Sequence, residues 1–401
     1  MRMGLRYNIP KLYVLNCIKN MMFFAAVAVP IYTDWAGLDY TRLFVLEASF
    51  AFWVFALEVP TGVVADRYGR KYSLALGCLL SAGSFALYGL VNSYAVFFAA
   101  EFICALGMTL VSGADRAIFY DTLLALGKEA RAAYYFSRYE IAGTVGIIAG
   151  LLGGAYLAGS GLARYPATLP LTFLLTAAAL LPGALLALAL AEPERKKIDG
   201  KLLRQGINGF THIFKIRRLR AFSLNYTFIS AAGFFMFWLY QPLLRQSGIT
   251  ISYNGIVGSA FNLLGIILMV NITAIEKRTG IRPLLILTAL LPGILYIGLF
   301  FTESALYTVP AMLFIVGLKQ MRAPLLADLI NRDIESVNRA TVLSGLSMLE
   351  RIITMFMYPV VGLLADRSVG AACLFLGAAM FLFAAATGTG AALEPDAKEA
   401  A

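Results

Sequence analysis

The sequence predicts an all-α polytopic membrane protein with twelve transmembrane helices, and three observations predict this fold class. First, 60% of the 401 residues are hydrophobic and only 14% are charged, whereas soluble domains have roughly 45–50% apolar and about 25% charged residues. Second, the mean hydropathy of +0.76 comes from apolar runs along the whole chain, each near or above the roughly 20 residues that span a bilayer. Third, the basic residues are divided unevenly between the connections.

Twelve apolar segments account for the spans. They cover residues 10–33, 41–65, 71–91, 94–121, 132–159, 167–191, 218–246, 250–276, 283–301, 304–330, 338–366 and 369–388. With a cytoplasmic N-terminus, the inner connections carry roughly 23 of the 33 Lys and Arg residues and the outer ones roughly four. This bias predicts that both termini and residues 192–217 are cytoplasmic. The net charge of +10 therefore reflects topology and contact with anionic membrane lipids, and we expect no nucleic-acid partner.

The residue types and their spacing exclude metal binding, a disulfide framework, ATP binding and catalysis. The four cysteines are far apart in apolar runs, and His212 is the single histidine, so we expect no metal site and no disulfide framework. The sequence contains no Gly-x-x-x-x-Gly-Lys-Ser/Thr loop for ATP. Because no nucleophile with a neighbouring base is visible either, we expect a protein that is not an enzyme and needs no cofactor.

The longest polar interruption divides the chain into six spans plus six. We expect an N-terminal bundle over residues 1–191, a cytoplasmic linker over 192–217 and a C-terminal bundle over 218–401. Apolar residues at helical spacing among basic ones predict a helix on the membrane surface within the linker. Shifting the halves by roughly 208 residues aligns Arg131-Ala132 with Arg339-Ala340. The two halves are therefore interpreted as pseudo-repeats, which place a substrate site between them near the midplane.

One motif lies between the second and third spans and reads Gly62-Val63-Val64-Ala65-Asp66-Arg67-Tyr68-Gly69-Arg70-Lys71. It resembles the cytoplasmic signature Gly-x-x-x-Asp-Arg-x-Gly-Arg-Lys of the major facilitator superfamily (MFS) at every defining position. Gly62 suits close helix packing, Gly69 permits a tight reversal, and Asp66 can face a helix N-terminus. The resemblance covers essentially the whole chain and implies the MFS fold. The expected gating residues are Gly62, Asp66, Arg67, Gly69, Arg70, Lys71 and Asp121, the last as the partner of Arg70 or Arg67.

Further segments narrow the resemblance. Glu58 to Gly62, Ser112 to Asp115 and Arg339 to Ser344 are similar to bacterial and archaeal members that export drugs or other small molecules. This similarity implies a monomeric secondary transporter in the cell membrane of a prokaryote, which moves a small organic solute outward by alternating access, coupled to protons. Drug antiporters often carry Gly-Pro-x-x-Gly-Gly in span five, where this chain has Ala149-Gly150-Leu151-Leu152-Gly153-Gly154. The missing proline leaves the direction open.

Two alternatives and one imitation of the signature accompany this interpretation. The first alternative is uptake or uniport of an anionic metabolite, which the cations inside the spans favour. The second is a membrane receptor or scaffold that does not transport, against which the intact signature argues. Gly362-Leu363-Leu364-Ala365-Asp366-Arg367 imitates the signature but lacks the following Gly-Arg-Lys, and by span parity it lies outside. We interpret it as a polar helix end.

Charged residues inside the spans are the candidate functional residues, because each costs on the order of 2.5–3.5 kcal/mol at a helix centre unless it has a partner or water. Lys19 and Asn16 share one face of the first span, and Lys19 is the first choice for a cavity residue, with a structural ion pair as its alternative. The expected substrate-binding residues are Asn16, Lys19, Arg138, Lys319, Arg322 and Arg351.

The acidic residues divide between proton coupling and structure. The expected coupling residues are Glu140, Glu350 and Glu58, of which Glu58 is equally a candidate structural acceptor beside the signature. Glu47 shares one face of span two with Glu58, which suits a proton path. Asp115, beside Arg116, is interpreted as half of a local ion pair.

Overall fold

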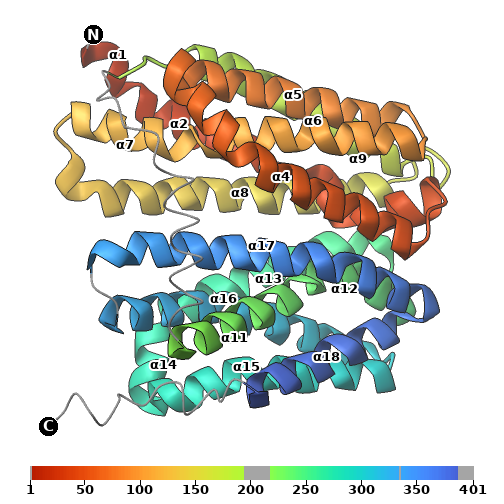
Figure 1. Cartoon of the computed structure of the whole chain (residues 1–401). Helices are drawn as coiled ribbons and strands as arrows, with labels where there is room; N and C mark the ends of the chain where they lie inside the picture. The colour runs from red at the N-terminus through yellow and green to blue at the C-terminus, as the bar shows by residue number, and fades with distance from the viewer. Residues whose placement is uncertain (1, 194–216, 334–335, 387–401) are drawn as a thin grey trace, which may run out of the picture. The chain divides into compact units, whose positions relative to one another are not determined.

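The computed structural model describes residues 2–193, 217–333 and 336–386, and in this part of the chain every regular element is helical (Figure 1). The longer helices are α2 (Asn8–Lys19), α4 (Tyr40–Tyr68), α5 (Arg70–Leu90), α6 (Tyr94–Ser112), α7 (Asp115–Ala125), α8 (Ala132–Gly159), α9 (Leu169–Leu188), α11 (Arg217–Phe234), α12 (Met236–Gln246), α13 (Asn254–Val270), α14 (Ile272–Thr279), α15 (Ile281–Phe301), α16 (Ala305–Asp333), α17 (Ser336–Arg367) and α18 (Val369–Ala386).

These helices match the twelve predicted spans, so the predicted fold class is confirmed. Ten helical segments are long and apolar enough to cross a membrane, and Val369–Ala385 is a shorter apolar helix. Four spans are built from consecutive helices rather than from one. The first consists of α2 and the short helices η1 (Phe23–Val27), α3 (Ala28–Pro30) and η2 (Ile31–Trp35). The fourth consists of α6 and α7, the seventh of α11 and α12, and the eighth of α13 and the start of α14. The helix expected in the linker lies outside the described residues.

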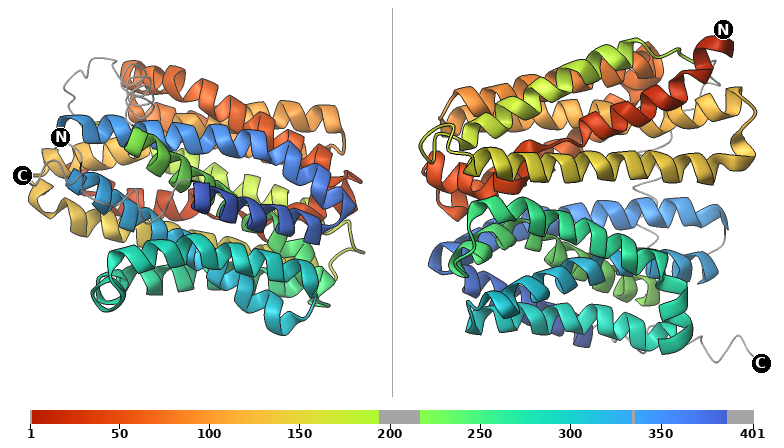
Figure 2. Two further views of the ribbon diagram at one scale, coloured as in Figure 1. Left: turned by 60° about the horizontal axis from the view of Figure 1, so that its bottom comes forward. Right: turned by 180° about the vertical axis from the view of Figure 1, so that it is seen from behind.

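The chain forms two units. The first contains residues 1–39, 45–200 and 251–259, and the second contains residues 40–44, 201–250 and 260–401. In the first unit α5 packs against α6 and α9, and α2 packs against α8 and α9, as the two opposite views in Figures 1 and 2 also show. A Cβ added to Gly77 of α5 would lie 2.7 Å from the carbonyl oxygen of Gly107 of α6, so the two backbones cross in near contact.

Glycines on α8 bring that helix against the interrupted first span. A Cβ on Gly143 would lie 2.8 Å from Nδ2 of Asn16, and one on Gly150 would lie 2.7 Å from the backbone nitrogen of Met22. A Cβ on Gly153 would lie 2.8 Å from the Phe23 ring. The small residues expected in span five therefore serve close packing even without the proline of the antiporter motif.

The second unit repeats this pattern of small-residue contacts. There α15 packs against α16 and α18, and α11 packs against α17. A Cβ on Gly293 of α15 would lie 3.2 Å from the carbonyl oxygen of Gly377 of α18. This unit also includes the first turn of α4, where Asp366 accepts hydrogen bonds from the backbone nitrogens of Tyr40 (2.7 Å) and Thr41 (3.1 Å) and from the Thr41 hydroxyl. Asp366 therefore satisfies two of the free amide groups at that helix start.

Candidate functional site

The first span is interrupted beside its basic residue. Helix α2 ends at Lys19, residues 20–22 are not helical, and η1 begins at Phe23. The Asn20 side chain closes the end of α2 by donating to the carbonyl oxygen of Asn16 (2.7 Å), and the backbone nitrogen of Phe23 donates to Thr176 Oγ1 (3.0 Å). Lys19 therefore lies at a helix C-terminus, where the partial negative charge of the carbonyls stabilises a cation.

A second helix end provides the partner of Lys19. Span four bends between Ser112 and Asp115, so that Asp115 starts α7 in the position that favours a negative charge. Lys19 and Asp115 form an ion pair with 17% and 9% of their side-chain surfaces exposed. The Tyr139 hydroxyl of α8 donates to Asp115 Oδ2 (3.1 Å) and accepts from Lys19 Nζ (3.2 Å). Three helices thus meet in one buried polar cluster, Lys19–Asp115–Tyr139.

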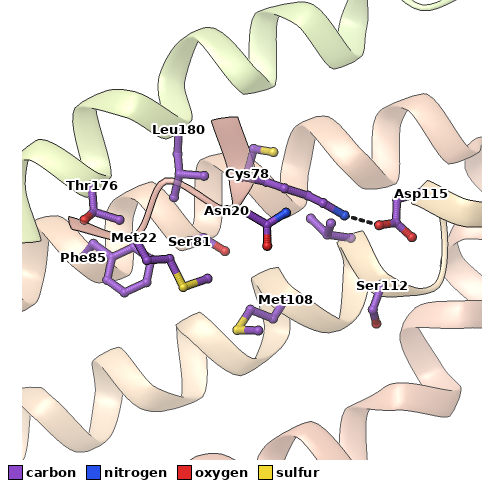
Figure 3. A pocket seen from close by; sticks show the side chains of 12 residues that line it. Asn20, Met22, Cys78, Ser81, Phe85, Met108, Ser112, Asp115, Thr176 and Leu180 are labelled. Carbon is purple, nitrogen blue, oxygen red and sulfur yellow. Dashed lines mark hydrogen bonds and ion pairs between the residues drawn. The ribbon is translucent and has the colours of Figure 1, made fainter. Parts of the chain in front are cut away.

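Lys19 and Asp115 of this cluster line a cavity of about 160 Å³ in the first unit (Figure 3). In Figure 3 the dashed line to Asp115 marks this ion pair, and Phe85, Met22 and Leu180 lie toward the other end of the cavity. The lining residues are Lys19, Asn20, Met22, Cys78, Ser81, Phe85, Met108, Val111, Ser112, Asp115, Thr176 and Leu180. The cavity therefore combines an apolar wall with hydroxyl and amide groups and one neutralised pair of charges.

Asn16 supports the cavity from behind rather than lining it. Its side chain is buried and donates to the backbone carbonyl oxygen of Tyr139 (2.6 Å), while its Oδ1 accepts from Asn20 (3.1 Å). Since the Tyr139 hydroxyl holds Asp115, Asn16 fixes the helix turn that positions this hydroxyl.

The two charged candidates of span five point away from this cavity. Glu140 pairs with Arg116 (2.9 Å), and both side chains are more than half exposed. The Arg138 guanidinium lies over the ring of Tyr134, 4.6 Å from its centroid. The local pair expected between Asp115 and Arg116 is wrong: their side chains diverge and find partners on α2 and α8, because adjacent helix positions face different directions.

In the second unit, the predicted cations are held by neutral groups. Arg322 is 2% exposed and donates to the carbonyl oxygen of Leu285 (2.8 Å), to Thr288 Oγ1 (3.0 Å) and to Asn225 Oδ1 (2.6 Å). Lys319 lies over the ring of Phe234, with Nζ 5.2 Å from the centroid.

The acidic candidate of the second unit is Glu350, which accepts a hydrogen bond from Ser230 Oγ (2.5 Å) and interacts electrostatically with Lys319. Its neighbour Arg351 is half-buried. The neutralisation expected between spans ten and eleven remains a prediction, and Lys319 and Glu350 are its candidate pair.

The signature motif forms the expected turn. Gly69 has a φ of 122°, a conformation that favours glycine. Arg70 is buried and forms an ion pair with Asp121, and its other terminal nitrogen lies 3.9 Å from Asp66. Arg67 and Lys71 lie over the rings of Tyr68 and Tyr72. Gly62 lies against Gly113, whose added Cβ would be 3.7 Å from the Gly62 Cα.

Two parts of this site were missed by sequence reasoning. Glu192 accepts hydrogen bonds from the backbone nitrogens of Arg70 (3.0 Å) and Lys71 (3.1 Å), so it caps the start of α5 from the far end of the first unit. Tyr139 is indistinguishable in sequence from the other tyrosines of its span. Glu58 is exposed, and no described contact joins it to the cavity.

Twelve helices in two units, a cavity with charged walls inside the membrane-spanning part and a basic turn between the second and third spans define a multi-pass membrane transporter. The profile of the Major Facilitator Superfamily matches residues 12–349. The chain therefore belongs to this superfamily and is a transporter rather than an enzyme.

Comparison with individual solved structures shows the fold. The structure of the nucleoside transporter NupG superimposes with a TM-score of 0.81 at 15% identity, covering 97% of this chain and 99% of that one. The D-xylose–proton symporter gives 0.71 at 15% identity, covering 93% and 96%. The uncharacterized MFS-type transporter YxaM of Bacillus subtilis (strain 168) is 35% identical over 75 residues, which is 19% of either chain.

Proposed function

We propose that this protein is a proton-coupled secondary transporter that exports a small organic solute by alternating access. The observation that carries the proposal is the cavity of the first unit with the ion pair of Lys19 and Asp115 in its wall. Alternating access requires a solute site enclosed by protein within the membrane, and substrate sites in transporters are built at discontinuous helices. The interruption after Lys19 is such a discontinuity.

The cavity walls favour a small amphipathic solute. Phe85, Met108 and Leu180 offer an apolar surface, while Ser81, Ser112 and Thr176 offer hydroxyl groups that can donate or accept. The Lys19 charge is already neutralised by Asp115, so the cavity presents little net charge to a solute. A solute with an aromatic or aliphatic body and one hydrogen-bonding group fits these walls best.

A screen followed by a transport assay tests this function. Purified protein is exposed to a panel of drugs, organic acids and metabolites in a thermal-shift assay, and the labelled form of the strongest stabilising compound is then used for counterflow in proteoliposomes. We expect counterflow in the wild type and weaker binding in Ser112→Phe, which fills the cavity without changing its charge. Ser160→Phe, outside the cavity, is the matched control. A protein that binds but shows no counterflow with any compound would instead be a receptor or scaffold.

Uptake of an anionic metabolite is the second candidate, and Arg322 favours it. This cation is held only by neutral oxygens among the described contacts, and its Nε lies buried without a hydrogen-bond partner in that part of the chain. A carboxylate on a solute would supply the missing negative charge, with Lys319 of the same unit as a further cationic contact. Binding of organic acids but not of neutral compounds, lost in Arg322→Gln, would favour uptake of an anion over export.

The proposal includes an orientation: a monomer in the cell membrane of a prokaryote, with both termini and residues 192–217 cytoplasmic. The distribution of Lys and Arg supports it. Single cysteines placed in residues 192–217 of a variant lacking the four native cysteines should not react with an impermeant thiol reagent in intact cells. A cysteine at Arg164, in an expected outer connection, should react, and the opposite pattern would overturn the orientation.

A further inference from the structure

Two glutamates, Glu47 and Glu101, are buried together in the first unit, away from the ion pairs described above. Glu47 on α4 is 9% exposed and Glu101 on α6 is 4% exposed. Each glutamate lies seven residues, or about 10 Å along the axis, after the first residue of its helix. These first residues are Tyr40 of α4 and Tyr94 of α6, and both helices start from the same side of the membrane. Their carboxyl groups interact electrostatically with each other.

The groups around this pair are hydroxyls and a thiol. Tyr88 of α5 donates a side-chain hydrogen bond to Glu101 and shares another with Tyr32 of η2. Cys104, one turn after Glu101, also faces the pair. No lysine or arginine forms an ion pair with either glutamate in the part of the chain that the structure describes. Glu47 has no described hydrogen-bond partner, although it is nine-tenths buried and interacts with Glu101.

Elementary electrostatics requires a bound cation at this place. Removing one ionised carboxylate from water costs several kcal/mol, and two neighbouring negative charges without a positive partner add mutual repulsion. When two carboxyl groups share a proton, the repulsion disappears, and the protonated group can donate a hydrogen bond to the one carboxylate that stays charged. The described residues contain no group of three metal-ligating side chains here or elsewhere, which leaves the proton as the ligand that the pair fits.

We propose that Glu47 and Glu101, together with the hydroxyl of Tyr88, form the proton-binding site that couples solute transport to the proton gradient. The proton is taken from water on one side of the membrane, is held between the two carboxyl groups, and is returned to water on the other side. This inference rests on the proposed function and replaces the coupling residues expected from sequence, of which Glu140 and Glu58 are exposed and Glu350 is bound by Ser230.

Direct packing links the pair to the cavity. The Phe173 ring stacks on both Tyr88 (4.9 Å between centroids) and Phe85 (6.0 Å), and Phe85 lines the cavity. On α6, Met108 also lines the cavity and lies two turns beyond Glu101, on the same face. A solute that moves Phe85 therefore displaces the Phe173 ring that supports Tyr88. This movement changes the hydrogen bond that Tyr88 donates to Glu101, and with it the binding of the proton. This contact path is how solute occupancy and proton occupancy would influence each other.

The site itself is tested with protons alone, without any solute. Infrared difference spectra of the purified protein in lipid are recorded while the pH is changed at constant sodium concentration. We expect the carbonyl band of a buried carboxylic acid to appear on acidification in the wild type and to be lost or shifted in Glu47→Gln and Glu101→Gln. The exposed Glu129→Gln, outside the spans, should behave as the wild type. A band identical in all four proteins, or one that responds to sodium but not to pH, overturns the proposal.

One further variant keeps this test decisive if a Gln variant does not fold. Gln is close in shape to a protonated Glu, so both substitutions should fold. If either fails to fold, Tyr88→Phe removes the hydroxyl but keeps the ring. It should shift the pH at which the band appears, and an unchanged titration would remove Tyr88 and the pair from the proposal.

Coupling is then measured with the labelled compound from the thermal-shift screen. In the wild type a gradient of one pH unit should drive about a tenfold accumulation for each proton exchanged. Glu101→Gln should accumulate nothing above equilibrium, whereas Glu129→Gln, outside the proton-binding site, should accumulate the compound as the wild type does. Wild-type accumulation in Glu101→Gln would overturn the coupling role. Absent counterflow in the wild type would instead contradict the proposed function, and the infrared result would still decide on the proton site.

Discussion

The two units hold their buried cations in different ways. In the first unit, Lys19 is paired with the carboxylate of Asp115 at the meeting point of two helix ends. In the second, Arg322 is more deeply buried and is bound by a carbonyl, a hydroxyl and an amide oxygen. In an ion pair the two charges cancel, so removing one partner leaves the other as an unpaired buried charge. Neutral oxygens do not cancel the charge of the cation. Removing the cation therefore leaves only uncharged acceptors without their hydrogen-bond donor.

The largest expected effect is therefore that of Lys19→Met. It leaves Asp115 buried and unpaired, which should lower the stability by about 3–5 kcal/mol, measured as thermal unfolding in detergent. The double variant Lys19→Met with Asp115→Asn should recover most of this loss. Lys11→Met, on the same helix but bonded to the carbonyl oxygen of Ala189 at the surface, is the matched control and should change little. Equal stability of Lys19→Met and the wild type would contradict the ion pair.

Arg322→Met is the corresponding substitution of the buried cation in the second unit. The variant leaves three neutral acceptors without their donor, for which we expect a loss of about 1–3 kcal/mol in the same measurement. Arg322→Lys, which keeps the charge but cannot reach all three oxygens, should lie between the variant and the wild type. A loss as large as that of Lys19→Met would show that Arg322 has a carboxylate partner after all.

The signature motif extends the comparison to a charge pair proposed to act in gating. Asp66→Asn or Arg70→Ala should slow counterflow at least about tenfold, equivalent to about 1.4 kcal/mol on the rate-limiting step, while the thermal shift by the bound compound changes little. The reason is that Arg70 contacts Asp66 and Asp121, and none of the three residues lines the cavity. Affinity that falls in proportion to transport would assign these residues to binding instead.

The smallest effect is expected at Asp366, whose partners are again neutral. Asp366→Ala removes the acceptor for two backbone amides at the start of α4 and should cost about 1 kcal/mol of stability. Asp366 uses both of its carboxylate oxygens, and Asp366→Asn keeps only one acceptor oxygen, so it should lie between the wild type and Asp366→Ala. If both variants lose the same amount, the negative charge and not the hydrogen bonding stabilises this contact.

The comparison also shows which parts of the site were readable from sequence. Lys19 and Arg70 were identified because a charge in an apolar span or in a spaced motif is visible in the chain itself. Their outcomes differ: Asp121 was expected for Arg70 and contacts it, whereas Asp115 was assigned to Arg116 and contacts Lys19 instead. The helix break after Lys19 carries neither glycine nor proline, so no local signal marked it.

The sequence by itself determined the membrane, the spans and the family, because bilayer thickness and backbone hydrogen bonding impose a length and an apolar composition on each segment. It also determined the signature turn, since Gly69 needs a conformation that other residues avoid. Only the tertiary structure decided which charges meet. Lys19 and Asp115, or Glu47 and Glu101, lie far apart along the chain and are brought together by helix ends and by glycine contacts between helices. Such pairings depend on the rotation and depth of each helix, which apolar periodicity in a lipid environment does not specify.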